Sequence, residues 1–336
     1  MKRLSLLFVV PLGLVGLSCV GLAACASKPG DTAESTDGIS PEEAQKNPIQ
    51  GIGAAKVLID TGSYTDGPVW HAGESVLFFT VPIGDGDVPG LYRVRPDGSA
   101  MKVRGGTVKT GEVPVGNAID AKGELVTAEA KRLLRGAPNA EPAAVAAGYP
   151  SDKGTTPFDT LNDVVVHKNG TMYVTDPGYF ADPPPESNRL YRIGPDGVVT
   201  IADTFANVPR PNGVALSPDQ KILYVGFERP PAGTKPYVEK YFLKDDGTLA
   251  EHSHFAELEI DASPDGVEVD KAGNVYVANK AGVTVFKADG KKIGNVAVPD
   301  QPTGLAFGGA DLKTLYITTA GSKIYSVKVN VTGINQ

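Results

Sequence analysis

The chain has 336 residues, with 32 Lys and Arg against 39 Asp and Glu, so its formal net charge is −7. The positive charges form no cluster, which argues against a nucleic-acid partner. Both cysteines, Cys19 and Cys25, lie in the first 25 positions, so the rest of the chain offers no disulfide, thiolate metal site or cysteine nucleophile.

Residues 1–24 have the pattern of a lipoprotein signal peptide. The charged start Lys2-Arg3 precedes a mostly apolar run from Leu4 to Leu22, which contains Pro11 and glycines and ends at small residues. A transmembrane helix is the alternative, because the run is nearly long enough to span a bilayer. The ending Leu22-Ala-Ala-Cys25 resembles the lipobox of bacterial lipoproteins, so we expect Cys25 to become the lipidated first residue.

Residues 25–53 are expected to form the lipidated cysteine and a flexible tether. From Ala26 to about Gly51 the chain is rich in Ser, Thr, Asp, Glu, Pro and Gly and has almost no large apolar residues. Such a segment buries too little surface to offset the entropy lost on ordering. We therefore expect an exported bacterial lipoprotein that reaches the outer membrane or cell surface and contacts the membrane through its lipid anchor only.

Residues 54–336 contain one unit repeated six times, at intervals of about 40 to 50 residues, the period of propeller blades. Each copy has an Asn, Asp or Thr beside a small residue, then a hydrophobic strand, a polar turn and a second strand. In the clearest copy, Val164-Val-Val166 and Thr171–Thr175 flank the turn residues Asn169-Gly170, a strong hairpin signal. The copies begin at Asp66, Asn117, Asn162, Asn212, Asp265 and Thr303.

These repeats predict an all-β protein, a six-bladed β-propeller. Third strands such as Leu91–Val94 and Leu190–Ile193 lead into Asp-Gly turns, and no stretch has a sustained 3.6-residue apolar period. Residues 55–59 precede the first copy and are expected to form the outer strand of the last blade, which closes the ring and removes a free edge. A β-sandwich is the alternative, but it does not predict six copies of one unit.

The residues that begin the copies are candidates for a metal site. In a propeller the innermost strands line a central channel, so equivalent positions of the repeat meet at its mouth. Two carboxylates and three amides there supply hard oxygen donors, which suit one divalent cation, Ca²⁺ first, with Zn²⁺, Mg²⁺ or Mn²⁺ as alternatives. Facing carboxylates also repel each other unless a cation lies between them. The alternative is that these Asn and Asp residues merely start turns.

Several segments resemble the signature segments of the SMP-30/gluconolactonase (regucalcin-like) family, and the likeness runs from about Ala54 to Val329. The resemblance implies a six-bladed propeller with one divalent ion at the channel mouth and hydrolysis of sugar lactones or related esters. The segments are Asp66-Gly-Pro-Val-Trp70, Leu161-Asn-Asp-Val-Val165 with Thr175-Asp-Pro-Gly-Tyr179, Pro211–Asp219, Ser263-Pro-Asp-Gly-Val267 and Pro302–Gly309.

The resemblance also implies roles for particular residues. It places metal ligands at Asp66, Asn212 and Asp265, a ligand or substrate contact at Asn162, and the favoured acid/base at Asp265. Residues expected to border the substrate are Asn117, Asn162, Asp176 and Tyr179.

The chain departs from the family pattern at several of these positions. The first motif usually begins with Glu, whereas here it begins with Asp66, which is shorter by one carbon–carbon bond of about 1.5 Å. Some members have Arg where this chain has Thr160, so a polyhydroxylated sugar lactone is less firmly implied. Leu161 stands where the family often has Pro, and Ala118 where it often has Gly.

We therefore expect a divalent-metal-dependent hydrolase that opens a lactone or related ester, acting as a monomer on a small molecule. The chain has no Gly-x-Ser-x-Gly elbow, no His-Glu-x-x-His motif and no phosphate loop. One alternative is an esterase or phosphotriesterase that uses the same metal site. The other is a non-catalytic exported propeller that binds a ligand or an envelope partner, since propellers support both kinds of function.

Overall fold

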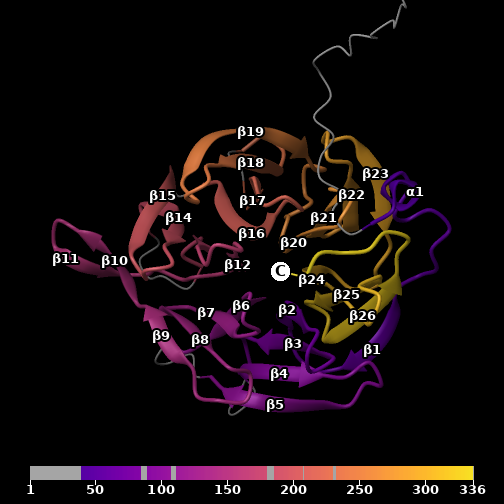
Figure 1. Ribbon diagram of the computed structural model, residues 1–336, viewed down its shortest axis with the longest axis horizontal. Coiled ribbons are helices and arrows are strands. Elements are labelled where there is room, and N and C mark those ends of the chain that lie inside the picture. Colours follow the sequence, from indigo (N-terminus) through magenta and orange to yellow (C-terminus); the bar gives the residue numbers. More distant parts are fainter. Residues whose placement is uncertain are drawn as a thin grey trace, which may run out of the picture. The chain divides into compact units, whose positions relative to one another are not determined.

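The computed structural model describes residues 39–84, 89–106, 111–179, 185–206, 208–229 and 232–335, which form a six-bladed β-propeller (Figure 1). The signal peptide and Cys25 lie outside the described residues. Each blade is a four-stranded antiparallel sheet. From the channel outward the first three blades are β2 (Asp66–His71), β3 (Val76–Val81), β4 (Gly90–Val94), β5 (Ala100–Gly105); β6 (Pro114–Ile119), β7 (Leu125–Glu129), β8 (Arg132–Gly136), β9 (Ala143–Ala146); and β12 (Val164–Val166), β13 (Met172–Asp176), β14 (Ser187–Ile193), β15 (Val199–Ala206).

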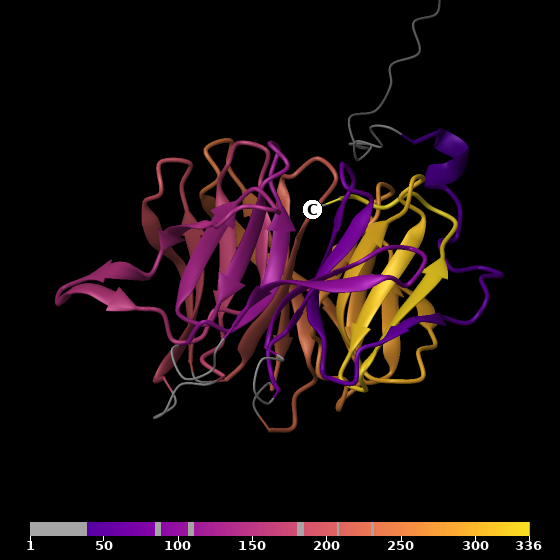
Figure 2. The same cartoon turned by 90° about the horizontal axis from the view of Figure 1, so that it is seen from below.

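The remaining three blades repeat this order. They are β16 (Arg210–Leu216), β17 (Ile222–Glu228), β18 (Tyr237–Leu243), β19 (Leu249–Glu257); β20 (Val267–Val269), β21 (Val275–Asn279), β22 (Gly282–Phe286), β23 (Lys292–Val296); and β24 (Pro302–Gly308), β25 (Thr314–Thr319), β26 (Lys323–Lys328), β1 (Lys56–Asp60). An additional hairpin of β10 (Gly148–Ser151) and β11 (Gly154–Pro157) projects away from the ring in Figures 1 and 2. Among the described residues, α1 (Pro41–Ala44) is the only α-helix. No helix in this part of the chain is long and apolar enough to cross a membrane.

The first strand of the chain closes the ring, as predicted. β1 pairs antiparallel with β26, from Lys56 opposite Ser326 to Asp60 opposite Lys323. The last blade therefore combines strands from both ends of the propeller sequence. This pairing removes an unpaired strand edge and holds the N-terminal strand in the last blade by main-chain hydrogen bonds.

The six inner strands surround the channel and pack in a closed sequence. Each of β2, β6, β12, β16, β20 and β24 contacts the next, and β24 contacts β2. Burial decreases outward within a blade: β3 is wholly buried, whereas β5 is mostly half-buried or exposed. Large side chains fill the space between blades, as where Trp70 stacks on Tyr316 with ring centroids 5.5 Å apart. Trp70 therefore packs between the first and the last blade.

The small residues beside the repeated Asn and Asp positions allow neighbouring inner strands to meet at their backbones. The N–H of Gly116 donates to the carbonyl of Asn162 at 2.8 Å, and the N–H of Gly213 donates to the carbonyl of Asp265 at 3.2 Å. A Cβ on Gly213 would collide with the same Asp265 carbonyl and lie 2.6 Å from the nitrogen of Val267. Glycine therefore occupies the positions at which the backbone of one inner strand binds the residue that begins the next copy of the repeat.

We expect Gly213→Ala to lower the free energy of unfolding by about 1–3 kcal/mol, because the added methyl group must push β20 away from β16. The change should also lower activity by displacing Asp265. Urea denaturation followed by circular dichroism measures the first effect. Gly53→Ala is the control, since a Cβ there meets nothing within 4 Å and should change stability by less than about 0.5 kcal/mol. Equal unfolding midpoints for the two variants would contradict this account of the interblade contact.

Residues 41–52 are attached to the last blades, although the sequence analysis placed them in the flexible tether. The carboxylate of Glu43 accepts hydrogen bonds from the N–H and hydroxyl of Thr332, and lies 3.0 Å from the Lys313 ammonium. These contacts lower the pKa of Glu43 to about 2. Ile49 and Ile52 pack against the core between the fifth and sixth blades. The composition argument overlooked these apolar residues, so only residues 25–38, outside the described residues, keep the tether as a prediction.

Candidate metal and substrate site at the channel mouth

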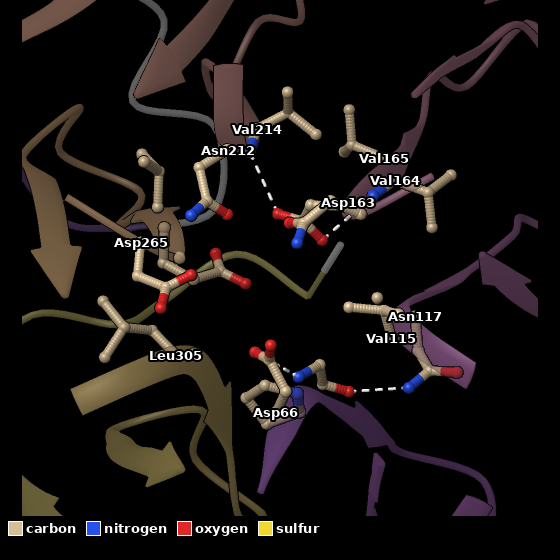
Figure 3. Close-up of a pocket in the computed structure, with 18 residues that line it drawn as sticks. Asp66, Val115, Asn117, Asp163, Val164, Val165, Asn212, Val214, Asp265 and Leu305 are labelled. Carbon is tan, nitrogen blue, oxygen red and sulfur yellow. Dashed lines mark hydrogen bonds between the residues drawn. The ribbon is translucent and has the colours of Figure 1, made fainter. Parts of the chain in front are cut away.

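A cavity of about 490 Å³ opens at one mouth of the channel, within the usual range for small-molecule sites. It is lined by four of the six residues that begin the repeated units: Asp66, Asn162, Asn212 and Asp265. These residues span 199 positions of the sequence, yet their side chains meet because each lies near the start of an inner strand. Asp66 begins β2, Asn212 is the third residue of β16, and Asn162 and Asp265 lie two residues before β12 and β20. Figure 3 shows Asp66, Asn212 and Asp265 directed toward a common space.

Asp66 is buried at the start of β2. One of its carboxylate oxygens accepts a hydrogen bond from the N–H of Gly67 at 2.8 Å, and the other accepts one from the hydroxyl of Tyr64 at 3.4 Å. Loss of water around the carboxylate raises its pKa to about 6, and these two hydrogen bonds oppose the rise. Tyr64 also lines the cavity and was not predicted. Its position two residues before Asp66, on the same side of an extended chain, is the signal that could have identified it.

Asp265 is the most strongly perturbed carboxylate at the mouth. Burial raises its pKa well above the ordinary value, and the nearby charges of Asp66, Glu228 and Asp163 raise it further. A hydrogen bond with the Asn212 side chain opposes this rise. Because a buried carboxylate that faces other carboxylates holds a proton strongly, Asp265 is chemically suited to accept and return a proton.

Asn212 joins the two sides of the cavity. Its side-chain N–H donates to the hydroxyl of Tyr179 at 3.0 Å. Its carbonyl oxygen Oδ1 is buried and has no hydrogen-bond partner among the described residues. An orphaned buried carbonyl is costly, so a group that binds oxygen would stabilise this arrangement. Tyr179, predicted as a substrate contact, lines the same cavity.

The channel below the mouth contains two further carboxylates that the sequence analysis did not select. Asp163 accepts hydrogen bonds from the N–H groups of Val164 and Val214, at 2.9 and 3.0 Å, which tie the third blade to the fourth (Figure 3). Burial raises its pKa to about 7. Glu268 is also buried in the channel wall, and burial raises its pKa well above the ordinary value. Asp163 directly follows Asn162, so the repeat position was the available signal.

Two residues predicted to border the substrate, together with one of the repeat positions, have structural partners instead. The side chain of Asn117 donates to the carbonyl of Gly67 at 2.7 Å and accepts from the hydroxyl of Thr127 at 2.8 Å. The hydroxyl of Thr303 donates to the carbonyl of Thr65 at 2.6 Å. Asp176 accepts hydrogen bonds from the backbone N–H groups of residues 159 and 160. None of the three lines the mouth cavity, so we leave Asn117 and Asp176 out of the proposed site.

The fourth blade gives the cavity a different chemical character on one side. Arg210, the first residue of β16, lies over the ring of Tyr179, with its guanidinium carbon 5.2 Å from the ring centroid. Glu228, the last residue of β17, accepts a hydrogen bond from Ser263 at 2.9 Å and pairs with Arg229 at 3.4 Å. Arg210, Glu228 and Arg229 all line the cavity. The fourth blade therefore adds two arginines and one further carboxylate to the cavity lining.

The residues present fit a hard divalent cation. The described residues contain no group of three or more His, Cys, Asp or Glu side chains placed to hold a metal ion, so carboxylates alone do not form a site. At the mouth, however, Asp66 and Asp265 are accompanied by the amides of Asn162 and Asn212. A cation would bind the orphaned oxygen of Asn212 and reduce the repulsion between the two carboxylates. A donor set made only of oxygens matches the preference of Ca²⁺.

Comparison with known proteins gives one consistent result. The sequence model of the SMP-30/Gluconolactonase/LRE-like region matches residues 64–321, a range that includes the whole lining of the mouth cavity. The chain is 26% identical over 290 residues to the gluconolactonase of Zymomonas mobilis, covering 79% of this chain and 78% of the relative. It is 32% identical over 266 residues to pentonolactonase XacC of Haloferax volcanii, covering 76% and 81%.

A solved structure extends the likeness to three dimensions. The gluconolactonase XC5397 of Xanthomonas campestris aligns with a TM-score of 0.71 and 25% identity, over 84% of this chain and 91% of that one. All three similar proteins are named as enzymes that act on lactones.

Proposed function

This chain belongs to the SMP-30/gluconolactonase/LRE-like family, and we propose that it hydrolyses a lactone at the mouth of its channel with the help of one divalent cation. The family supports lactone hydrolysis. The observation that supports the cation is the orphaned oxygen of Asn212, which lines the same cavity as Asp66 and Asp265, where the charge of Asp66 raises the pKa of Asp265. The proposed ligands are Asp66, Asn162, Asn212 and Asp265, with Ca²⁺ as the first candidate.

A cation held by these residues would polarise the lactone carbonyl and stabilise the negative charge that develops on its oxygen. The chain's own residues have separate tasks. Asp265 accepts a proton from the attacking water through its carboxylate. The oxygen of that water then bonds to the carbonyl carbon, and the bond from that carbon to the ring oxygen breaks. The proton passes from Asp265 to the released ring oxygen, which becomes a hydroxyl. One water is consumed, and the product is a hydroxy acid.

The other lining residues are proposed to orient the substrate. The hydroxyls of Tyr64 and Tyr179 face the carboxylate and amide that border the reacting position. Burial raises the pKa of both tyrosines well above the ordinary value, so both hydroxyls stay protonated and serve as donors or acceptors. The cavity walls are fixed by backbone hydrogen bonds between blades, which keeps the groups in position before substrate arrives.

A panel of lactones assayed for acid release, with and without a chelator, tests this proposal. We expect the purified protein to hydrolyse at least one five- or six-membered lactone, to lose this activity in chelator, and to regain it on addition of Ca²⁺ in excess. Zn²⁺, Mg²⁺ and Mn²⁺ are added in parallel arms. Aryl esters and phosphotriesters belong in the same panel, because a polarising cation could serve them too.

Three outcomes would change the proposal. Undiminished lactone hydrolysis in chelator would remove the cation. Preference for aryl esters or phosphotriesters would keep the site and change the substrate. No hydrolysis of any compound, with Ca²⁺ bound and the protein folded, would favour the non-catalytic ligand-binding propeller.

The export and lipid anchor remain proposals that rest on the sequence. Their support is the apolar run that ends at the lipobox-like Leu22-Ala-Ala-Cys25.

A further inference from the structure

Arg210 forms no ion pair with any described residue, although it lies in a cavity rich in carboxylates. Its Nε is buried without a hydrogen-bond partner, and its guanidinium lies over the ring of Tyr179. A guanidinium offers five N–H donors in a rigid fork and stays charged at all ordinary pH values. Leaving Nε buried without a partner costs free energy, which a ligand that binds the guanidinium would offset.

The internal partner that the strand pairing suggests does not form an ion pair with Arg210. Arg210 lies directly opposite Glu228 in the pairing of β16 with β17, where opposite charges normally attract. One oxygen of the Glu228 carboxylate accepts a hydrogen bond from Ser263. The other lies 3.4 Å from the Arg229 Nε and has no hydrogen-bond partner among the described residues, and neither oxygen forms an ion pair with Arg210. Arg229 follows β17 and Ser263 follows β19, so both contacts to Glu228 come from outside the strand pair that carries Arg210 and Glu228. The charge of Arg210 therefore remains available to a ligand in the cavity.

The position of Arg210 relates it to the proposed reaction centre. Arg210 and Asn212 are two residues apart on β16, so their backbones are about 6–7 Å apart along the strand. Tyr179 connects them, because its hydroxyl accepts from Asn212 while its ring supports the guanidinium. A molecule whose carbonyl lies beside Asn212 would thus extend its far end toward Arg210.

We propose that Arg210 binds a carboxylate on the substrate, so that the preferred substrate is a lactone that also carries a free carboxylate. The inference rests on the proposed lactonase function and specifies the substrate class. A carboxylate matches the planar fork of a guanidinium with two parallel hydrogen bonds. Arg210 would hold the anionic end of such a molecule, so its uncharged carbonyl would lie beside Asn212 and its carboxylate beside the guanidinium.

Two lactones that differ at one carbon test the proposal. Glucono-1,5-lactone carries a hydroxymethyl group where the 1,5-lactone of glucaric acid carries a carboxylate. We expect the wild-type protein with Ca²⁺ to show the higher kcat/KM for the acidic lactone. Arg210→Met keeps the apolar stem but removes the charge, and should lower the ratio of the two kcat/KM values by about 10- to 100-fold, the loss typical of a hydrogen bond to a charged group. The ratio for Arg210→Lys should fall between those of the wild-type protein and Arg210→Met, because lysine keeps the positive charge but lacks the planar guanidinium.

Arg95→Met is the matched control, since it removes the same charge from an exposed turn outside the cavity lining and should leave the ratio near the wild-type value. Calorimetric titration with glucarate and gluconate, the open-chain acids, provides a measurement that needs no turnover. Wild-type protein should bind glucarate more tightly, and Arg210→Met should abolish most of that preference. Thermal melts confirm that each variant is folded.

The outcomes separate this inference from the proposed function. Suppose that neutral lactones are hydrolysed and that Arg210→Met changes neither the kcat/KM ratio of the two lactones nor the binding preference for glucarate over gluconate. The inference is then overturned and the lactonase function stands. If no lactone is hydrolysed while glucarate binding depends on Arg210, the lactonase function falls and the carboxylate site stands.

Discussion

Asp265→Asn should reduce kcat for the best lactone by at least about 100-fold, and by up to about 10,000-fold, the range for loss of a general base. The substitution keeps the size of the side chain and an oxygen donor, but it removes the charge and the capacity to accept a proton. In the structure this carboxylate is buried at the mouth, and its pKa is raised by burial and by neighbouring carboxylates. Steady-state kinetics at saturating Ca²⁺ measure the effect.

In the cation-free protein, Asp265→Asn should not lower stability. Replacing one of several mutually repelling buried carboxylates with a neutral amide removes repulsion, so the melting temperature without Ca²⁺ should not fall. Asp270→Asn is the matched control: this carboxyl is also buried in the fifth blade, but it binds Asn274 and Tyr276 and does not line the cavity. It should keep near-wild-type kcat. An Asp265→Asn variant with wild-type kcat would remove Asp265 from the reaction.

Asp66→Ala should weaken Ca²⁺ binding by at least about 100-fold, the upper end of the loss seen when only a supporting partner of a metal ligand is removed. Asp66→Glu should preserve or tighten binding, because it restores the longer carboxylate usual at this position of the family and extends into the mouth cavity. Calorimetric titration of cation-free protein with Ca²⁺ measures both. Asp97→Ala, which removes the same charge from an exposed turn, is the control.

The pH dependence of this binding follows from the raised pKa of Asp66. In the cation-free protein that pKa is about 6, so the carboxyl is protonated below this pH and ionised above it. Ca²⁺ must displace the proton, and its apparent affinity should weaken as the pH falls through 6. If Asp66→Ala binds Ca²⁺ as tightly as the wild-type protein, the ligands lie elsewhere and the site must be reassigned.

The propeller could be predicted because its information is periodic. Six copies of one unit at a regular interval specify six blades, and Lys56–Asp60 had no other copy to belong to, so it had to close the ring. The attachment of residues 41–52 could not be predicted in this way. It depends on a few contacts, such as Glu43 with Thr332, to residues almost 290 positions away, and these contacts belong to no repeat.

The candidate site was predictable to the extent that it follows the repeat. The four residues that meet at the mouth all lie near the start of an inner strand: Asp66, Asn162, Asn212 and Asp265. Asn117 occupies the equivalent position in the second blade, yet its amide is used by Gly67 and Thr127. Sequence position determines where a side chain starts. Only the neighbouring blade determines whether its polar atoms are already taken.

Arg210 illustrates this limit most clearly. The sequence places it two residues before Asn212, where the fourth copy of the repeat begins, and the structure shows that the strand starts at Arg210. Strand pairing then sets Arg210 opposite Glu228, which would favour an internal ion pair. The tertiary structure decides otherwise, because Ser263 binds one oxygen of Glu228, Arg229 lies 3.4 Å from the other, and the Arg210 guanidinium lies over the ring of Tyr179. Hydrogen-bonding capacity is shared among groups that meet only after folding, so an unpaired charge is a property of the folded chain rather than of its sequence.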